Sequence, residues 1–283
     1  MPSPLLRLAR QWIAGEKAED GIKRVREANS RGILGLLNLL GEHIESREQI
    51  AGTLKEYSKL LDLIEDSKVD SQISIKPTQM GLNLDFDFCL ANYMEMVEKC
   101  KTHSNNWLWI DMENVPYIQK TIDLYTRVLA KHPNTGIAIQ SYLKRSEQDL
   151  QYLLPLGANV RLVKGAYNES PEFVFKDKKQ ISDNYGNLMR LMFERGDRNF
   201  VAVATHDGKL VDLAKDLGKS GKVRFEFEML MGVRDNLKME LVSQHYQVRE
   251  YIPYGPQWLS YSIRRIREKK SNILLLGRSI FTA

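Results

Sequence analysis

Short apolar runs rich in β-branched and aromatic residues recur eight times along this 283-residue chain, with longer amphipathic stretches between them. The runs occupy residues 33–40, 72–76, 107–112, 136–140, 159–163, 199–205, 223–229 and 250–254. The stretches between them, such as 47–66, 115–132 and 209–219, repeat apolar residues at the three-to-four spacing of a helix. Eight strand–helix repeats in a chain of this length predict an α/β fold, a (β/α)8 barrel of the TIM type.

An open, doubly wound sheet is the structural alternative. Such sheets usually have fewer strands, and the nucleotide binders among them carry a glycine fingerprint after the first strand. No GxGxxG occurs in this sequence. Residues 19–32 read as an extra helix ahead of the first strand. We therefore expect an N-terminal helical segment over residues 1–30 and a catalytic barrel domain over residues 31–283.

Polar residues gather where the predicted strands end. The strands carry, at or near their carboxyl ends, Lys76, Asp111, Gln140, Arg161, Thr205, His206, Glu228 and Tyr251. In a barrel of this type the loops at that end build the pocket. The sequence therefore predicts one functional site there.

The seventh run, RFEFEM, alternates aromatic and charged residues. Side chains alternate across a strand, so Phe225 and Phe227 should face the helices while Arg224, Glu226 and Glu228 point into the barrel. Buried charges must be paired. Their expected partners are the charged groups on other strands, Lys76, Asp111 and Arg161. A purely structural lattice of ion pairs is the alternative for each of these residues.

The sequence lacks the motifs of several classes of site. GKS at 218–220 lacks the first glycine of a phosphate-binding loop, because position 213 is Leu213. HExxH and GxSxG are absent from the sequence. The strand ends are rich in cations, which oppose a divalent metal, so we expect no metal site. The net charge of +5 suits an anionic ligand, but no arginine-rich tract with interleaved aromatics predicts nucleic-acid binding.

Cysteine usage and the N-terminus bear on location. Cys89 and Cys100 lie in a helix-like run about three turns apart, too far for a disulfide, which indicates reduced thiols in a cytoplasmic protein. The first residues lack the apolar region of a signal peptide, and the longest apolar runs fall short of the ~20 residues that span a bilayer. The basic start, LLRLARQWI, is best interpreted as a surface helix. Peripheral contact with the inner face of the membrane is the alternative.

A basic stretch follows the eighth predicted strand. In YSIRRIREKK, Tyr261 precedes Arg264 and Arg265 by three and four residues, so the three share one helical face. Trp258 lies one turn earlier. Guanidinium groups bind carboxylates through a planar fork of donors, so this face suits a small amphipathic acid.

Five segments together resemble the proline dehydrogenase family. They are SIKPTQMGL (74–82), RLVKGAY (161–167), ATHD (204–207), EFEMLMG (226–232) and YIPYGPQWLSYSIRR (251–265). The resemblance runs from about residue 20 to residue 278. It implies a (β/α)8 barrel that binds FAD and oxidises L-proline to Δ1-pyrroline-5-carboxylate by hydride transfer to the flavin N5, the first step of proline catabolism.

The resemblance also implies roles for individual residues. Catalytic roles fall to Asp111, near Lys76 at the substrate end, and Arg161, beside the flavin N5. The residues implied in substrate binding are Lys76, Leu230, Tyr251, Tyr261, Arg264 and Arg265, with the two arginines on the carboxylate. Those implied in holding the flavin are Met112, Gln140, Arg161, Lys164, Gly165, Ala166, Thr205 and His206. Either Asp111 or solvent takes the proton of the substrate amine.

Other assignments stay open at this point. The electron acceptor implied by the family is a membrane quinone or another redox carrier. One rival is oxidation of hydroxyproline on the same fold, although Tyr251 should crowd a ring hydroxyl. A second is a barrel lyase that forms a Schiff base on Lys76 or Lys164. The third is a non-catalytic basic binding module. Pro77 departs from the aliphatic residue usual in the family and is expected to re-aim the loop after the second strand.

Overall fold

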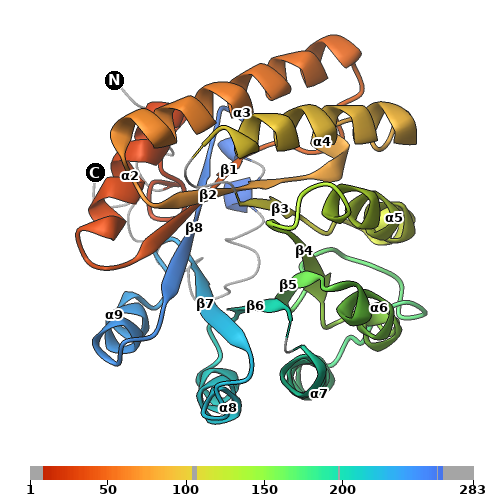
Figure 1. The fold of residues 1–283 in the computed structure, drawn as a ribbon, viewed down its shortest axis with the longest axis vertical. Coiled ribbons are helices and arrows are strands. Elements are labelled where there is room, and N and C mark those ends of the chain that lie inside the picture. Colours follow the sequence, from red (N-terminus) through yellow and green to blue (C-terminus); the bar gives the residue numbers. More distant parts are fainter. Residues whose placement is uncertain (1–8, 104–106, 197, 260, 264–283) are drawn as a thin grey trace, which may run out of the picture.

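Eight parallel strands close into a barrel in which each strand pairs with the next and β8 pairs with β1 (Figure 1). The computed structural model describes residues 9–103, 107–196, 198–259 and 261–263. Within these residues the strands are β1 Leu34–Leu39, β2 Ser71–Ile75, β3 Leu108–Ile110, β4 Thr135–Gln140, β5 Asn159–Val163, β6 Phe200–Ala204, β7 Arg224–Leu230 and β8 Val248–Tyr254. All eight predicted runs form strands, so the barrel prediction is confirmed and the open sheet is excluded.

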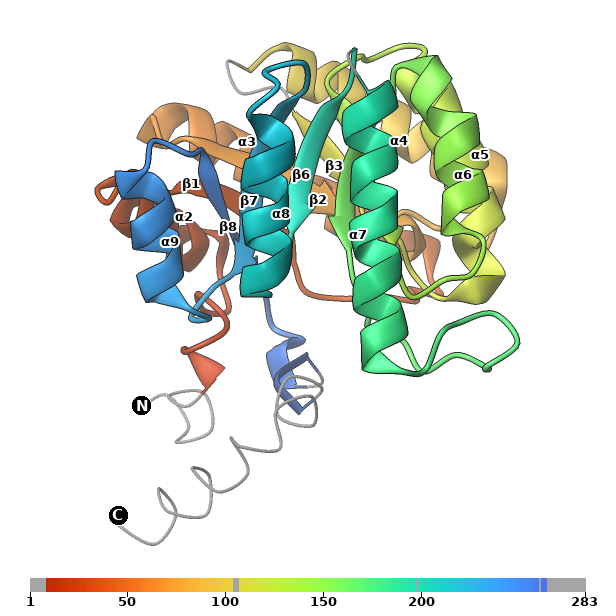
Figure 2. The same ribbon diagram turned by 90° about the horizontal axis from the view of Figure 1, so that it is seen from below.

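Helices surround the strands and run alongside them (Figure 2). They are α2 Ala18–Asn29, α3 Arg47–Ser67, α4 Phe86–Lys101, α5 Ile118–Leu129, α6 Ser146–Leu153, α7 Lys178–Arg195, α8 Gly208–Gly218 and α9 Asp235–Ser243. Short 3-10 turns follow some of the strands and helices, at η1 Pro77–Gln79, η2 Val115–Tyr117 and η3 Leu154–Leu156. Among the helices that the structure describes, none has the length and apolar character needed to cross a bilayer.

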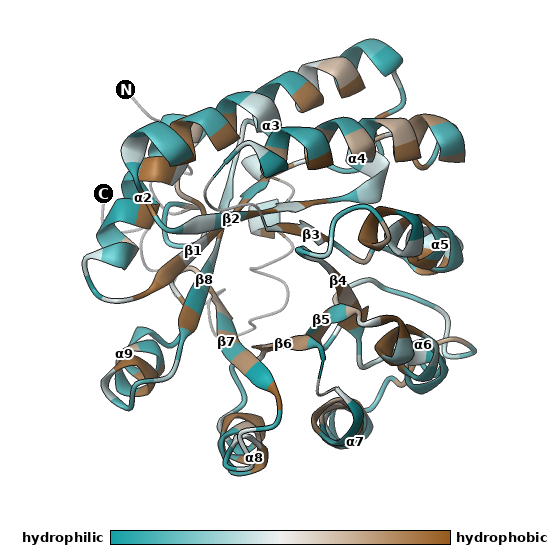
Figure 3. Ribbon diagram, in the orientation of Figure 1, coloured by the Kyte–Doolittle hydropathy of each residue, from teal (hydrophilic) through white to brown (hydrophobic). Residues whose placement is uncertain are grey.

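The helices bind the barrel through apolar stripes. In α3, Ser46 caps the first turn by accepting a hydrogen bond from the Gln49 amide (3.4 Å). Apolar residues of this helix repeat at helical spacing and are buried, and Figure 3 shows the hydrophilic residues of α3 and α4 on their outer side. The α4 stripe includes Cys89 and Cys100, which are buried free thiols, as predicted.

Strand β7 has the predicted alternation except at its first residue. Phe225 and Phe227 face outward and pack edge-on against one another at 5.5 Å between ring centres, while Glu226 and Glu228 are buried inside. The expectation that Arg224 is buried inside the barrel is wrong. It is exposed, because it opens the strand at the amino end of the barrel, where water reaches the side chain.

Residue size inside the barrel varies with height. Near the amino end, Trp109 fills the interior, and its indole Nε1 donates to Gln72 Oε1 (2.6 Å). The neighbouring strand offers Gly136, where a Cβ atom would come within 2.2 Å of the Trp109 ring. Higher up, β4 and β6 present Ala138 and Ala204, which line a cavity. Large side chains thus close the lower barrel and small ones open its carboxyl end.

This arrangement predicts opposite effects for two glycine substitutions. Gly136→Ala should lower the free energy of unfolding by about 1–3 kcal/mol, because the new methyl group overpacks against a buried indole. Gly52→Ala is the matched control, since its Cβ would meet nothing within 4 Å on exposed α3. Removing a helical glycine should raise the free energy of unfolding by about 0.5–1 kcal/mol. Urea denaturation of both variants measures this, and equal effects would contradict the packing described here.

Candidate active site

A cavity of about 580 Å³ opens at the carboxyl end of the barrel. Its volume lies within the range of small-molecule and cofactor sites. The carboxyl ends of β2 to β8 each contribute a predicted site residue, or a residue next to one, to the wall of the cavity. The site predicted from the strand ends therefore exists as one connected space.

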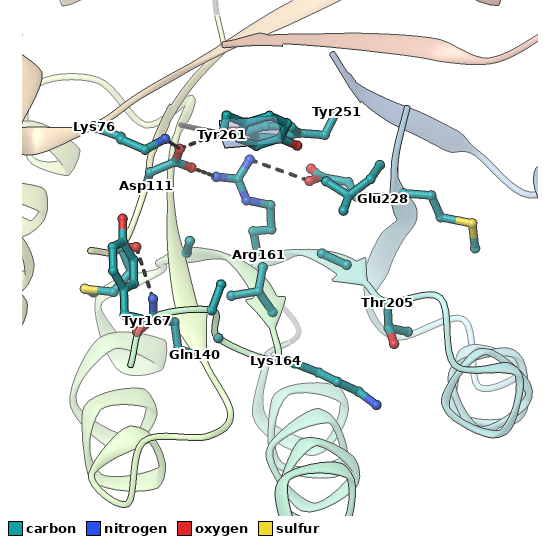
Figure 4. Close-up of a pocket in the computed structure, with 18 of the residues that line it drawn as sticks. Lys76, Asp111, Gln140, Arg161, Lys164, Tyr167, Thr205, Glu228, Tyr251 and Tyr261 are labelled. Carbon is teal, nitrogen blue, oxygen red and sulfur yellow. Dashed lines mark hydrogen bonds and ion pairs between the residues drawn. The ribbon is translucent and has the colours of Figure 1, made fainter. Parts of the chain in front are cut away.

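Arg161 on β5 stands at the centre of the wall and bridges two carboxylates (Figure 4). Its Nη2 donates to Asp111 Oδ1 and to Ser74 Oγ (2.9 Å), and its Nη1 lies 3.6 Å from Glu228 Oε2. Its register partner on β4 is Ala138, which leaves room for the guanidinium to reach β3. On the other side, the β6 partner is an alanine as well. Small neighbours thus let one arginine span the barrel from β3 to β7.

Asp111 accepts hydrogen bonds from four side chains. Besides Arg161, these are Ser74 Oγ (2.7 Å), Lys76 Nζ (3.1 Å) and Tyr251 Oη (3.0 Å). Burial alone would raise the pKa of Asp111, but Lys76 and Arg161 outweigh it and hold the pKa well below its usual range. The carboxylate is therefore ionised at neutral pH and has little affinity for a proton.

Lys76 follows β2 directly and is held by the turn after it. Pro77 occupies the first position of η1, where the missing proline N–H leaves no lost hydrogen bond. The buried Glu113 carboxylate fixes this turn by accepting from the Thr78 amide (2.8 Å) and hydroxyl (2.6 Å). Burial would lower the pKa of Lys76, but Asp111 reverses this and raises the pKa above its usual value. Lys76 thus stays a cation, which is unfavourable for a Schiff-base lysine.

Three buried polar atoms in the cavity wall have no hydrogen-bond partner among the residues that the structure describes. They are Arg161 Nη1, Gln140 Oε1 and Glu228 Oε1. The amide nitrogen of Gln140 donates to the Met112 carbonyl (3.1 Å), which fixes the orientation of the side chain. Unpaired buried polar atoms are unfavourable unless a ligand or water completes them. A donor flanked by acceptors on one wall suits the polar edge of a flat heteroaromatic ligand.

Aromatic side chains lie beside the Arg161 cluster. The Tyr251 ring lies 5.7 Å from the Arg161 guanidinium carbon, and Trp109 lies below that guanidinium at 5.2 Å. Tyr261 is buried against Leu40 and the Trp258 ring. Tyr251, Tyr261 and the lysine at the end of β2 lie near one another in Figure 4. This wall offers an apolar surface beside a fixed positive charge.

The loops after β5 and β6 form the rim. Gly165 has a φ of 103°, a left-handed conformation that favours glycine, and a Cβ there would lie 2.3 Å from the Tyr142 ring. Lys164 Nζ donates to Asp207 Oδ2 (3.0 Å), and its side chain points away from the Arg161 cluster in Figure 4. His206 Nε2 accepts from the Leu230 amide (2.9 Å), which joins the β6 loop to the end of β7.

The predicted site residues that the structure describes line one cavity, and their roles in binding and catalysis stay predictions. The cavity wall includes Lys76, Asp111, Met112, Gln140, Arg161, Lys164, Gly165, Ala166, Thr205, His206, Leu230, Tyr251 and Tyr261. Arg264 and Arg265 lie outside the described residues, so their assignment to a carboxylate stays a prediction.

Sequence reasoning missed part of the wall. Glu42 and Tyr167 line the cavity and join the loops after β1 and β5, with Tyr167 Oη donating to Glu42 Oε2 (3.1 Å). Gln257 lines it as well. Glu228 was expected among the polar residues at the strand ends but was given no role in binding or catalysis. The position of Glu42 just after a predicted strand could have indicated it. No pattern in the sequence indicated its pairing with Tyr167 across two loops.

Comparisons with known proteins agree on one family. The family model for proline dehydrogenase matches residues 21–275. Proline dehydrogenase 2 of Bacillus subtilis is 34% identical over 281 residues, covering 95% of this chain and 92% of that protein. Proline dehydrogenase of Deinococcus radiodurans is 33% identical over 276 residues, covering 94% of this chain and 87% of that protein.

A solved structure agrees on the fold. Proline utilization A from Bdellovibrio bacteriovorus superposes with a TM-score of 0.82 at 20% identity. The match covers 93% of this chain but 32% of that much longer one. The likeness shows a shared barrel architecture.

The Asp111 environment predicts a pH-dependent stability contribution. Asp111→Asn should lower the free energy of unfolding by about 3–5 kcal/mol near neutral pH, because Lys76 and Arg161 lose their shared counter-charge. The folded pKa is depressed, so this contribution is present above the unfolded pKa of about 3.9 and is lost as the pH falls toward the folded value. The difference between wild type and variant should therefore shrink in acid.

Urea denaturation at neutral pH and near pH 3 measures this difference. The control is Asp123→Asn on the exposed face of α5, where we expect a change within about 0.5 kcal/mol at either pH. A loss for Asp111→Asn that is the same at both pH values would contradict the depressed pKa.

Proposed function

Because the chain belongs to the proline dehydrogenase family, we propose that it oxidises L-proline to Δ1-pyrroline-5-carboxylate with FAD as the hydride acceptor. The observation that carries the proposal is the buried cluster of Lys76, Asp111 and Arg161 in a cavity of about 580 Å³. Two cations share one carboxylate there and lie beside an aromatic wall. Such a site favours a small acid with an apolar ring.

The residues present fit a flavin. The unpaired Gln140 Oε1, Arg161 Nη1 and Glu228 Oε1 offer an acceptor, a donor and an acceptor to a polar heteroaromatic edge. We propose that the backbone of residues 164–166, with Met112, Thr205 and His206, holds the rest of the cofactor. When bound, FAD supplies the acceptor for a hydride from the ring carbon next to the proline nitrogen. A guanidinium beside it favours the negative charge that develops.

The substrate side is built around Lys76. Its ammonium group, held by Asp111, provides one donor for the proline carboxylate, and Arg264 and Arg265 are proposed to provide the others. Leu230, Tyr251 and Tyr261 line the same cavity and would pack over the pyrrolidine ring. With the carboxylate fixed and the ring enclosed, the reacting carbon is confined to one orientation.

The charge state of Asp111 favours solvent as the proton acceptor. Its pKa is well below the usual range, and all four of its donors are already in place. A group of this kind is a poor general base near neutral pH. We therefore propose that Asp111 acts electrostatically, by holding Lys76 and Arg161, and that the ammonium proton of proline leaves to water.

Two rivals are weakened by the geometry. A Schiff-base lyase needs a neutral lysine, whereas Lys76 is ion-paired with Asp111, and Lys164 points away from the cluster and donates to Asp207. Hydroxyproline oxidation needs room for a ring hydroxyl beside Tyr251. That residue is held in the cavity wall by its bond to Asp111 (3.0 Å), which favours the unsubstituted ring.

The remaining assignments rest on family resemblance and sequence pattern. We propose a cytoplasmic enzyme reoxidised by a membrane quinone or another redox carrier. Residues 1–30 would form an N-terminal helical segment and residues 31–283 the catalytic domain. Peripheral contact with the inner face of the membrane is the alternative to a simple surface helix for the basic start of the chain.

The proposed activity predicts a yellow protein. Purified protein should show the visible spectrum of bound flavin, and anaerobic L-proline should bleach it. A colourless protein that binds no added FAD would contradict the proposal. Bleaching by hydroxyproline but not by proline would support the rival substrate instead.

The carboxylate assignment predicts a selective kinetic defect. Arg264→Met should raise the KM for proline by about 10-fold or more, since a charge-assisted hydrogen bond contributes about 1.5–3 kcal/mol. The flavin spectrum should be unchanged. Arg267→Met is the matched control, because we expect Arg267 to lie on the solvated face of the same stretch. Loss of flavin from Arg264→Met, or an equal KM effect in the control, would refute the assignment.

A further inference from the structure

Glu228 is a buried acidic residue of the cavity wall to which the proposed reaction gives no role beyond that of a hydrogen-bond acceptor for the flavin edge. It lies on β7 and is 2% exposed. Its Oε2 is 3.6 Å from Arg161 Nη1, and its Oε1 has no hydrogen-bond partner in the described part of the chain. The facing Arg161 Nη1 also lacks a hydrogen-bond partner, so 3.6 Å is a loose contact. Both groups are therefore available to a ligand in the cavity.

The pair exists because the strand between its members carries small residues. β6 separates β5 from β7, and its register partners to Arg161 and Glu228 are Ala202 and Ala204. Their methyl groups leave the two charged side chains facing one another across the interior. Figure 4 shows the guanidinium between Asp111 and Glu228. The contact thus depends on the residues of three adjacent strands, β5, β6 and β7.

Several titratable or charged groups surround Glu228. They are Asp111 on β3, Arg161 on β5, Glu226 on β7 itself, Arg249 and Tyr251 on β8, Tyr185 on α7 and His206 at the rim. Most are committed elsewhere. Glu226 accepts hydrogen bonds from Arg249 Nε (2.7 Å) and Nη2 (3.1 Å), and Asp111 accepts a hydrogen bond from Lys76. Glu228 alone among the carboxylates of this group has an oxygen without a partner.

The net charge around Arg161 depends on whether Glu228 is protonated. Lys76 and Arg161 are cations, and Asp111 is a fixed anion. If Glu228 is ionised, the four groups are neutral together. If Glu228 carries a proton, they hold one net positive charge. Protonation of this residue therefore adds one positive charge to the group around Arg161, which favours negative charge beside that guanidinium.

We propose that Glu228 is a positioning residue that holds Arg161 when ionised and binds a proton when negative charge enters the cavity beside that guanidinium. The inference rests on the proposed function, because reduction of bound FAD is what brings the charge. Glu228 acts through Arg161 rather than by reacting with substrate. The proton comes from solvent and forms an O–H bond on the Glu228 carboxyl. No other bond is made or broken at this residue.

The titration behaviour of the residue agrees with such a role. Burial raises the pKa of Glu228 to about 7, even though Arg161 opposes the rise. The residue is thus close to half-protonated near neutral pH, and added negative charge nearby raises the pKa further. Proton uptake should be largest above about pH 7, where the carboxyl is ionised before the charge arrives and protonated afterwards.

The test measures protons taken up when the flavin of the holoenzyme is reduced anaerobically. A pH-indicator dye reports uptake, and the pH dependence of the flavin midpoint potential reports the same quantity independently. Wild-type protein should bind extra protons, at most about one for each two electrons, beyond those that reduction of the flavin itself consumes. Glu228→Gln should lose this extra proton, counted per flavin bound. Glu226→Gln is the matched control and should keep it, because Glu226 is paired with Arg249.

Each outcome of these measurements either supports or refutes proton uptake by Glu228. Wild-type uptake limited to the proton of the flavin would overturn the inference, as would an equal loss in both variants. If Glu228→Gln fails to fold, the infrared difference spectrum of wild type with carbon-13-labelled glutamate serves instead. A protonated carboxyl band should appear on reduction, and its absence would refute the idea. A protein that binds no FAD would refute the proposed function, whereas a proline-reducible protein without extra proton uptake would refute only this inference.

Discussion

The ion pair between Arg161 and Asp111 is the interaction on which the site depends. Each group is buried, and an unpaired charge in this position would be strongly unfavourable. Arg161 reaches Asp111 because β4 and β6 present alanines beside it. The indole of Trp109 closes the barrel beneath the guanidinium. The residue sizes on β3, β4 and β6 are therefore explained together by this one pair.

The pair also fixes what the cavity can bind. Since Asp111 is shared by Lys76, Arg161, Ser74 and Tyr251, all of these donors are oriented before any ligand arrives. Preorganised charges of this kind stabilise developing charge without rearrangement. The same sharing removes Asp111 from proton transfer. In this chain the carboxylate is a scaffold for two cations, and the cations are the groups that face the ligand.

Much of this could be predicted from the sequence because a barrel fixes where strand ends meet. Eight apolar runs gave the strands, and polar residues such as Lys76 and Gln140 at their ends gave the site. Period-two alternation placed Phe227 outside and Glu228 inside. The exposed position of Arg224 was missed because alternation gives the direction of a side chain but not its depth in the barrel.

The pairings between distant residues could not be predicted in the same way. Arg249 meets Glu226 through the β7–β8 neighbourhood, and Glu42 meets Tyr167 through two loops, so neither contact has a sequence spacing of its own. The role of Gly165 also changed. Its left-handed φ and the nearby Tyr142 ring require glycine at this position whether or not a cofactor approaches.

A crystal structure of the protein with FAD and a non-oxidisable cyclic carboxylate tests the central claim most directly. The account predicts the carboxylate within hydrogen-bond distance of Lys76, its ring against Tyr251, and the flavin edge on Gln140 and Arg161. The Arg161–Asp111 pair should be unchanged. A carboxylate bound instead in the neighbouring cavity that Lys17 and Lys59 line, or a ligand that breaks the ion pair, would contradict it.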